Sequence, residues 1–264
     1  MHTNVVGRLS SGGPQLPRPE DLATIALLLD VDGTILDTAI TPGGVVVPSS
    51  LRSSLGELHA KSAGAVALVS GRMIRNLDAL FAPLRLPAIG GHGAEMRLSS
   101  DDATRTRQAV TIGRPLRDLI ASAVTFDPRV ILEDKGSSLA VHYRLAPHLE
   151  QTLKAKIAAI ITRTAARDLE VMHGNAVIEV KPTGFSKGEA VRDMMKNPPF
   201  AHRKPVFVGD DTTDESVFRV LPMLGGVGYS VERLIIGANG TFNSPREVRC
   251  WLARLCGREG ANRQ

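Results

Sequence analysis

Short runs of apolar residues, each ending in a polar residue, alternate along this chain with patterns typical of amphipathic helices. The runs and the residues that follow them are Ile25–Leu29 before Asp30, Ala65–Val69 before Ser70, and Pro205–Val208 before Gly209 and Asp210. Continuous apolar runs of this length are typical of strands in a parallel sheet that is covered on both faces. Helical patterns lie at Ser49–Lys61, Arg72–Phe81 and Lys187–Lys196. We therefore predict an α/β fold with a doubly wound, mostly parallel sheet, whose carboxyl edge carries the polar residues.

The middle of the chain has a different pattern, in which a helix followed by two strands occurs twice. The predicted helices are at 114–125 and 148–165, and the predicted strand pairs are at 130–134 with 138–145 and at 169–173 with 176–181. The strands of each pair are joined by Lys135-Gly136-Ser137 and by Gly174-Asn175, which are favourable tight-turn sequences. This pattern predicts an antiparallel sheet with helices on one face, inserted into the larger fold.

These patterns divide the chain into three parts. We predict a flexible N-terminal tail at 1–22, a core made of 23–106 and 184–264, and an inserted α+β domain at 107–183.

Composition limits the classes of protein that fit. The 264 residues are 43% hydrophobic, which is ample for a packed interior. The net charge of +5 is scattered and only 4% of residues are aromatic, so we expect a small anionic ligand and no nucleic acid. No apolar run approaches the ~18 residues of a membrane helix. The N-terminus also lacks the apolar stretch of a secretion signal, so we expect no membrane partner and a cytoplasmic location.

The most specific motif is Asp30-Val31-Asp32-Gly33-Thr34, directly after a predicted strand. Gly33 permits a bend at which the two carboxylates can converge. On its own, an Asp-x-Asp sequence could equally be a solvated acidic turn. The Gly-Thr continuation and the motifs that follow favour chemistry.

Three further motifs gain meaning from their order. Ser70-Gly71-Arg72 follows a strand and precedes a helix, a position that suits a phosphate oxygen but also an ordinary helix cap. Lys187 begins a helix and is uninformative alone. Gly209 is followed by a cluster of carboxylates, Asp210, Asp211, Asp214 and Glu215. Clustered carboxylates after a buried strand are costly unless a cation neutralises them, and oxygen ligands alone indicate Mg²⁺.

In this order, the motifs resemble the haloacid dehalogenase superfamily of aspartate-dependent phosphohydrolases, from Ala23 onward. Within it, the chain is similar to the trehalose-6-phosphate phosphatases. The segments that carry the resemblance are LLLDVDGTILD, ALVSGR, Gly91-His92-Gly93-Ala94-Glu95, ILEDKGSSLAVHYR, VIEVKP and VGDDTTDESVF.

The resemblance implies a role for each core motif. Asp30 would be the nucleophile that attacks phosphorus, and Asp32 the general acid and then the base for water. Mg²⁺ would be held by the Asp30 carboxylate, the Asp32 backbone carbonyl and Asp210. Residues implied to assist them are Asp211 and Asp214, which would orient metal-bound water, and Ser70 and Lys187, which would hold the phosphoryl oxygens.

The resemblance also implies substrate contacts. Arg72 and His92 would contribute from the core, and Glu133, Lys135 and Glu179 would contact the sugar from the inserted domain. Ordinary surface ion pairs on the inserted sheet remain an alternative, as does a structural role for His92 in its glycine-rich turn.

The expected activity is hydrolysis of trehalose 6-phosphate in trehalose biosynthesis. Alternatives are a phosphatase for another sugar phosphate, such as sucrose 6-phosphate or a glycosyl phosphoglycerate, and a non-catalytic sugar-phosphate sensor. A trehalose-phosphate synthase is a further possible partner, and the sequence leaves the oligomeric state open.

Overall fold

A computed structural model describes residues 15–38, 45–106, 112–136, 138–174 and 176–258. The chain forms two compact units, Met1–Arg105 together with Ser186–Gln264, and Thr106–Phe185. The predicted insertion at 107–183 is contained within the second unit.

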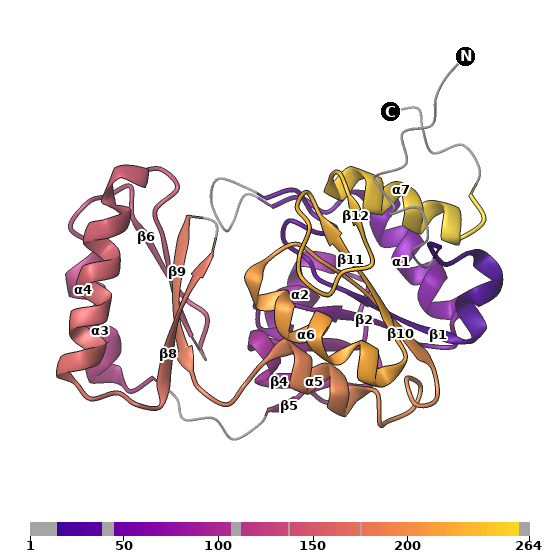
Figure 1. Cartoon of the computed structure of the whole chain (residues 1–264), viewed down its shortest axis with the longest axis horizontal. Helices are drawn as coiled ribbons and strands as arrows, with labels where there is room; N and C mark the ends of the chain where they lie inside the picture. The colour runs from indigo at the N-terminus through magenta and orange to yellow at the C-terminus, as the bar shows by residue number, and fades with distance from the viewer. Residues whose placement is uncertain (1–14, 39–44, 107–111, 137, 175, 259–264) are drawn as a thin grey trace, which may run out of the picture. The chain divides into compact units, whose positions relative to one another are not determined.

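A mostly parallel sheet forms the centre of the first unit (Figure 1). Its strand order is β12-β11-β10-β1-β2-β3-β4-β5. Neighbouring strands run parallel from β12 through β11, β10, β1 and β2 to β3, and β4 is antiparallel to β3. The strands are β1 (Ile25–Leu29), β2 (Val66–Val69), β3 (Ala88–Gly90), β4 (Glu95–Arg97), β5 (Arg105–Thr106), β10 (Lys204–Gly209), β11 (Val227–Val231) and β12 (Gly240–Phe242). The doubly wound α/β core predicted from the apolar runs is therefore confirmed.

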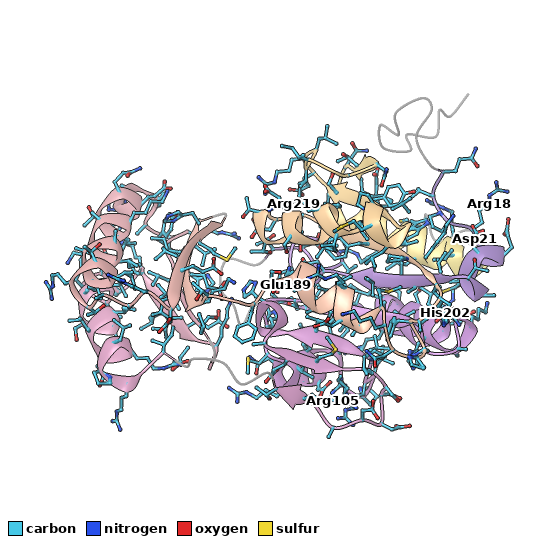
Figure 2. The ribbon with its side chains drawn as sticks, turned by 60° about the horizontal axis from the view of Figure 1, so that its bottom comes forward. Arg18, Asp21, Arg105, Glu189, His202 and Arg219 are labelled. Atoms are coloured by element: carbon cyan, nitrogen blue, oxygen red, sulfur yellow. The ribbon has the colours of Figure 1, made fainter. Side chains whose placement is uncertain are left out.

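Helices cover both faces of this sheet. Successive residues of each strand point to opposite faces, so each strand packs against helices on both sides. Leu27 and Leu29 pack in the cluster that contains side chains of α1, α2 and α7. Ala26 and Leu28 pack in the cluster that contains side chains of α5 and α6. The helices are α1 (Ser49–Lys61), α2 (Ile74–Phe81), α5 (Lys187–Met194), α6 (Glu215–Val220) and α7 (Pro245–Leu255). The exposed residues Glu189 and Arg219, labelled in Figure 2, mark the solvent side of α5 and α6.

The described part of the predicted tail is attached to this core. Residues 1–14 of the tail lie outside the described residues. Pro19–Ala23 forms a 3-10 helix, η1, and its Leu22 is buried in the core. The Trp251 indole donates a hydrogen bond to the carbonyl of Pro17 (3.2 Å). An apolar side chain and a hydrogen bond thus hold the chain to the core before residue 23.

The second unit is an α+β sandwich with one antiparallel sheet of order β6-β7-β9-β8. Its elements are α3 (Arg114–Val124), β6 (Ile131–Asp134), β7 (Leu139–His142), α4 (Glu150–Arg163), β8 (Leu169–Gly174) and β9 (Val177–Pro182), with a 3-10 turn, η4 (Pro147–Leu149), before α4. Figure 1 shows α3 and α4 on one face of the sheet, where Val141 and Ile178 pack with them. Both hairpins and the one-sided helices match the prediction, although Ser137 and Asn175 of the turns lie outside the described residues.

Among the described residues, none of the helices is both long and apolar enough to cross a lipid bilayer.

Candidate active site

Three neighbouring parallel strands bring the predicted residues to one edge of the core sheet. Strand β1 lies between β10 and β2, and Leu29 pairs with Val208 on one side and Leu68 on the other. Asp30, Ser70 and Asp210 follow these strands directly, so they are adjacent although they lie far apart in the sequence. The amide of Asp30 donates to the carbonyl of Val208 (2.9 Å), which continues the strand pairing into the site.

Lys187 is the cationic centre of this edge. Its ammonium donates to Asp30 Oδ1 (2.6 Å) and to Asp214 Oδ1 (2.7 Å), and all three side chains are buried. Lys187 is the first residue of α5, and Ser186 caps that helix by accepting the amide of Glu189. Burial alone would lower the pKa of Lys187, but the two carboxylates outweigh burial and raise it above its ordinary value.

Asp214 holds the loop that follows β10. Its Oδ2 accepts the backbone amides of Asp210 (3.0 Å) and Asp211 (3.1 Å), while its Oδ1 faces Lys187. A side chain at Gly209 would lie 2.5 Å from the Asp214 carboxylate, so only glycine fits there. Asp214 is therefore a central part of the site and links the acidic loop to Lys187.

Asp30 and Asp210 form an acidic pair that favours a cation. Burial raises the pKa of Asp30 well above its ordinary value, although Lys187 opposes the rise. Burial, followed by the charge of Asp214, raises the pKa of Asp210 to about 7. Oxygens of Asp30, Asp210 and Asp214 lie within 4.8 Å of one another. Three carboxylates beside one ammonium leave excess negative charge, and oxygen donors alone fit a hard divalent cation.

Asp32 does not join this acidic group through its carboxylate. Arg72 binds both oxygens of Asp32 in a bidentate ion pair, with Nε–Oδ2 and Nη2–Oδ1 distances of 2.6 and 2.7 Å. The Ser70 hydroxyl oxygen accepts the backbone amide of Arg72 (3.1 Å). Arg72 was expected to contact the substrate, and in this structure its guanidinium binds Asp32.

The glycine-rich turn around His92 packs against the Ser70 loop. The amides of Gly91 and His92 donate to the carbonyls of Arg72 (2.9 Å) and Ser70 (3.2 Å). A Cβ at Gly71 would lie 2.4 Å from His92 Nε2, so the buried imidazole lies directly on that loop. The structure thus brings His92 to the phosphate-binding loop predicted from the sequence, whereas its expected contact with substrate stays a prediction.

The Asp211 carboxylate is part of the turn beside the acidic group. It caps the 3-10 turn η5 (Thr212–Asp214) through the amide of Thr212 (2.6 Å) and faces Arg233 at 3.6 Å. Asp214 belongs to the acidic group and Asp211 caps the turn next to it, and the role expected for both residues stays a prediction.

The predicted sugar-contacting residues of the second unit lie on the sheet face opposite α3 and α4. Lys135 Nζ is 3.4 Å from Glu179 Oε2, and both side chains are largely buried. Glu133 Oε2 is 2.9 Å from His142 Nε2. Glu133 and Glu179 share this face because each pairs with Ala140 of the strand between them.

Two residues of the first motif contact Asp210, which the sequence did not predict. The Thr34 hydroxyl lies 2.8 Å from Asp210 Oδ1 and 3.1 Å from Asp30 Oδ2, so it bridges the acidic pair. Gly33 has a φ of 81°, and a Cβ there would lie 2.2 Å from Asp210 Oδ2. Both residues belong to the Asp-x-Asp-Gly-Thr motif, which was visible in the sequence. Their partner Asp210 lies 176 positions away from Thr34, so the motif alone does not predict the contact.

Comparison with solved structures identifies the class of fold. The C-terminal domain of Candida albicans trehalose-6-phosphate phosphatase superimposes with a TM-score of 0.79 at 24% identity, covering 93% of this chain and 98% of that chain. This chain has the same fold, which is of the haloacid dehalogenase type with an inserted α+β unit.

Sequence comparison places the chain within that class. The family model described as trehalose-phosphatase matches residues 28–240. A probable trehalose-phosphate phosphatase of Sinorhizobium fredii is 40% identical over 89% of each chain. The trehalose-6-phosphate phosphatase of Escherichia coli is 37% identical over 92% of this chain and 90% of that protein. The chain therefore belongs to the trehalose-phosphatase family and is a phosphoric monoester hydrolase.

Proposed function

We propose that this chain is a Mg²⁺-dependent phosphatase that hydrolyses trehalose 6-phosphate to trehalose and phosphate, in trehalose biosynthesis. The observation that carries the proposal is the buried Asp30 carboxylate, bound by Lys187 and adjacent to Asp210, in a chain of the trehalose-phosphatase family.

Asp30 acts as the nucleophile in this scheme. One oxygen of its carboxylate forms a bond to phosphorus while the bond between phosphorus and the sugar oxygen breaks. Asp32 gives a proton to the leaving sugar oxygen. Water then attacks phosphorus, Asp32 takes a proton from that water, and the bond between Asp30 and phosphorus breaks. Phosphate leaves and both carboxyl groups return to their starting state.

Arg72 controls when Asp32 can act. A carboxyl group whose two oxygens both accept from a guanidinium cannot donate a proton. A phosphoryl group also binds arginine through two oxygens and carries more negative charge than a carboxylate, so substrate binding draws Arg72 from Asp32 to the phosphoryl oxygens. Ser70 and Lys187 bind the remaining phosphoryl oxygens and stabilise the negative charge of the transition state.

The acidic group fits Mg²⁺. The Asp30 and Asp210 carboxylates and the Asp32 carbonyl would hold the ion, and Asp214 would fix the loop that carries Asp210. Support comes from the all-oxygen donor set and from the raised pKa of Asp210, which burial and then the charge of Asp214 produce. When bound, the ion neutralises carboxylate and phosphoryl charge, so that an anionic nucleophile can approach an anionic substrate.

Glu133, Lys135 and Glu179 supply the sugar contacts of the proposal. Two carboxylates and an ammonium on one sheet face offer acceptors and a donor to the hydroxyl groups of a disaccharide. The phosphatase centre itself binds only the phosphoester, so these three residues determine which sugar phosphate is preferred.

The test is phosphate release from a panel of sugar phosphates by the wild-type chain and Asp30→Asn. Trehalose 6-phosphate should give the highest kcat/KM, and Asp30→Asn should lose at least a thousandfold in kcat while keeping its fold. Asp193→Asn, which alters an exposed ion pair with Lys196, is the matched control and should retain activity. Higher kcat/KM for sucrose 6-phosphate or a glycosyl phosphoglycerate would replace the substrate assignment, and substantial turnover by Asp30→Asn would refute the nucleophile.

Chelation tests the metal assignment separately. Chelator should abolish phosphate release, and Mg²⁺ should restore it. Association with a trehalose-phosphate synthase and a cytoplasmic location stay predictions.

A further inference from the structure

Polar side chains at the two ends of β7, an inner strand of the second unit's sheet, reach both neighbouring strands. Strand β7 lies between β6 and β9. Ser138 directly precedes β7 and His142 is its last residue. They lie four positions apart, so both project from the same face of the sheet. That face also carries Glu133 on β6 and Glu179 on β9.

Each of these two side chains contacts one glutamate. Ser138 Oγ donates to Glu179 Oε1 at 2.5 Å, in a buried hydrogen bond. His142 Nε2 lies 2.9 Å from Glu133 Oε2, on the opposite side of β7. A carboxylate can only accept, so Nε2 carries the proton and donates.

These bonds fix the direction in which each glutamate accepts. A free glutamate loses rotamer freedom when it binds a ligand, at a cost of up to about 1.5–2 kcal/mol for each side chain. A glutamate already held by a neighbouring side chain avoids part of that cost, because its carboxylate is fixed before a ligand binds. Lys135, 3.4 Å from Glu179 Oε2, adds a donor to the same group.

We infer that Ser138 and His142 are positioning residues that hold Glu179 and Glu133 as hydrogen-bond acceptors for the hydroxyl groups of the sugar, and that they thereby set selectivity for a disaccharide phosphate. This inference rests on the proposed function, because it assumes that the two glutamates bind the sugar. It assigns a role to His142 at the end of β7 and to Ser138 directly before that strand.

The experiment compares a sugar phosphate with a phosphate ester that lacks a sugar. We would measure kcat/KM for trehalose 6-phosphate and for p-nitrophenyl phosphate in the wild-type chain, Ser138→Ala, His142→Ala and His142→Gln. The ratio of the two values is the selectivity. It should fall about tenfold in each alanine variant, mainly through KM, which corresponds to ~1.4 kcal/mol. Gln can donate from its amide nitrogen, so His142→Gln should recover most of the ratio.

Ser122→Ala is the matched control for the loss of a hydroxyl. Ser122 lies on α3, and its hydroxyl donates only to the carbonyl of Asp118 among the bonds observed, at an exposed position. The selectivity ratio of this variant should equal that of the wild-type chain.

Several results would overturn the inference. A ratio unchanged in both alanine variants would do so. An equal loss of kcat/KM on both substrates would indicate a merely structural role, as would failure of His142→Gln to recover the ratio. If the wild-type chain prefers another sugar phosphate, the proposed substrate fails, and the same ratio measured with the preferred sugar tests the positioning role. A wild-type chain without preference for any sugar phosphate would refute both.

Discussion

Asp214→Asn should destabilise the metal-free core at pH 5.5 and leave its stability nearly unchanged at pH 8. Asp214 is fully buried and accepts from Lys187 and from the amides of Asp210 and Asp211. An asparagine keeps the shape, and its amide oxygen can still accept the two backbone amides. Its NH₂ group then faces the Lys187 ammonium, so one charge-assisted hydrogen bond is lost. That loss lowers the free energy of unfolding by about 1.5–3 kcal/mol.

The substitution also removes a negative charge beside two others. The carboxylate oxygens of Asp214 and Asp210 lie within 4.8 Å. At an effective dielectric constant of about 20, their repulsion is ~3 kcal/mol when both are ionised. The pKa of Asp210 is raised to about 7, so this repulsion is present at pH 8 and largely absent at pH 5.5. Asp214→Asn should therefore destabilise the core by about 2 kcal/mol at pH 5.5 and be nearly neutral at pH 8.

Urea unfolding in chelator, followed by fluorescence, measures this difference. Trp251 is the single tryptophan of the chain and is buried in the core cluster, so it reports on the first unit. Asp193→Asn is the control, because its ion pair with Lys196 is exposed and is worth less than about 1 kcal/mol. With Mg²⁺ at pH 8, the ion already screens the repulsion in the wild-type chain. Asp214→Asn then relieves nothing and should again destabilise the core. A destabilisation that is the same at both pH values in chelator would refute the electrostatic reasoning.

Four further outcomes follow from the contacts of the core. Gly188→Ala should lower the free energy of unfolding by roughly 3 kcal/mol, because its Cβ would lie 2.1 Å from the carbonyl of Ser216, and urea titration checks this. Gly56→Ala in α1 has its nearest neighbour at 3.6 Å and should instead stabilise by about 0.5–1 kcal/mol in the same assay. Thr34→Val should raise the pKa of Asp210 further, because it removes a hydrogen bond that lowers this pKa, and it should reduce kcat about tenfold. Carboxyl-carbon NMR measures the pKa and phosphate release measures kcat. In chelator, the melting temperature of the wild-type core should fall as pH rises from about 4 to 7, because Asp210 binds its proton more tightly in the folded state than in the unfolded state, and Mg²⁺ should suppress the fall.

The core sheet was predictable where its strands are continuously apolar. Such strands are buried on both faces, so they stand out in the sequence, as Ile25–Leu29 does. Strands β3 and β4 have three residues each, too few for any periodicity to be visible. Strand β11 reads VGYSV, in which a glycine and a serine interrupt the apolar run. These strands become recognisable only through the neighbours with which they pair.

The candidate site was predictable in its members and not in their pairings. The order of the motifs, through the family resemblance, picked out Asp30, Lys187 and Asp210. The partner of a charged side chain, however, is chosen by the fold. Arg72 was expected to face substrate, and it binds Asp32, 40 positions earlier in the chain, because β1 and β2 are adjacent. A motif supplies residue types, whereas the strand order determines which of them meet.

The position of Asp214 shows why this distinction affects function. In the sequence it is one of several acidic residues in a loop, and nothing ranks it above Asp211. In the fold it is the buried carboxylate that binds Lys187, fixes the Asp210 loop and raises the pKa of Asp210. Its repulsion with the ionised Asp210 carboxylate offsets the stabilisation from its bond to Lys187 once the pH is above the pKa of Asp210. The same charge increases the attraction of the centre for a divalent cation, because the cation removes the repulsion that Asp214 creates. Asp214→Asn should therefore weaken Mg²⁺ binding by the proposed site at the pH where it no longer weakens the fold.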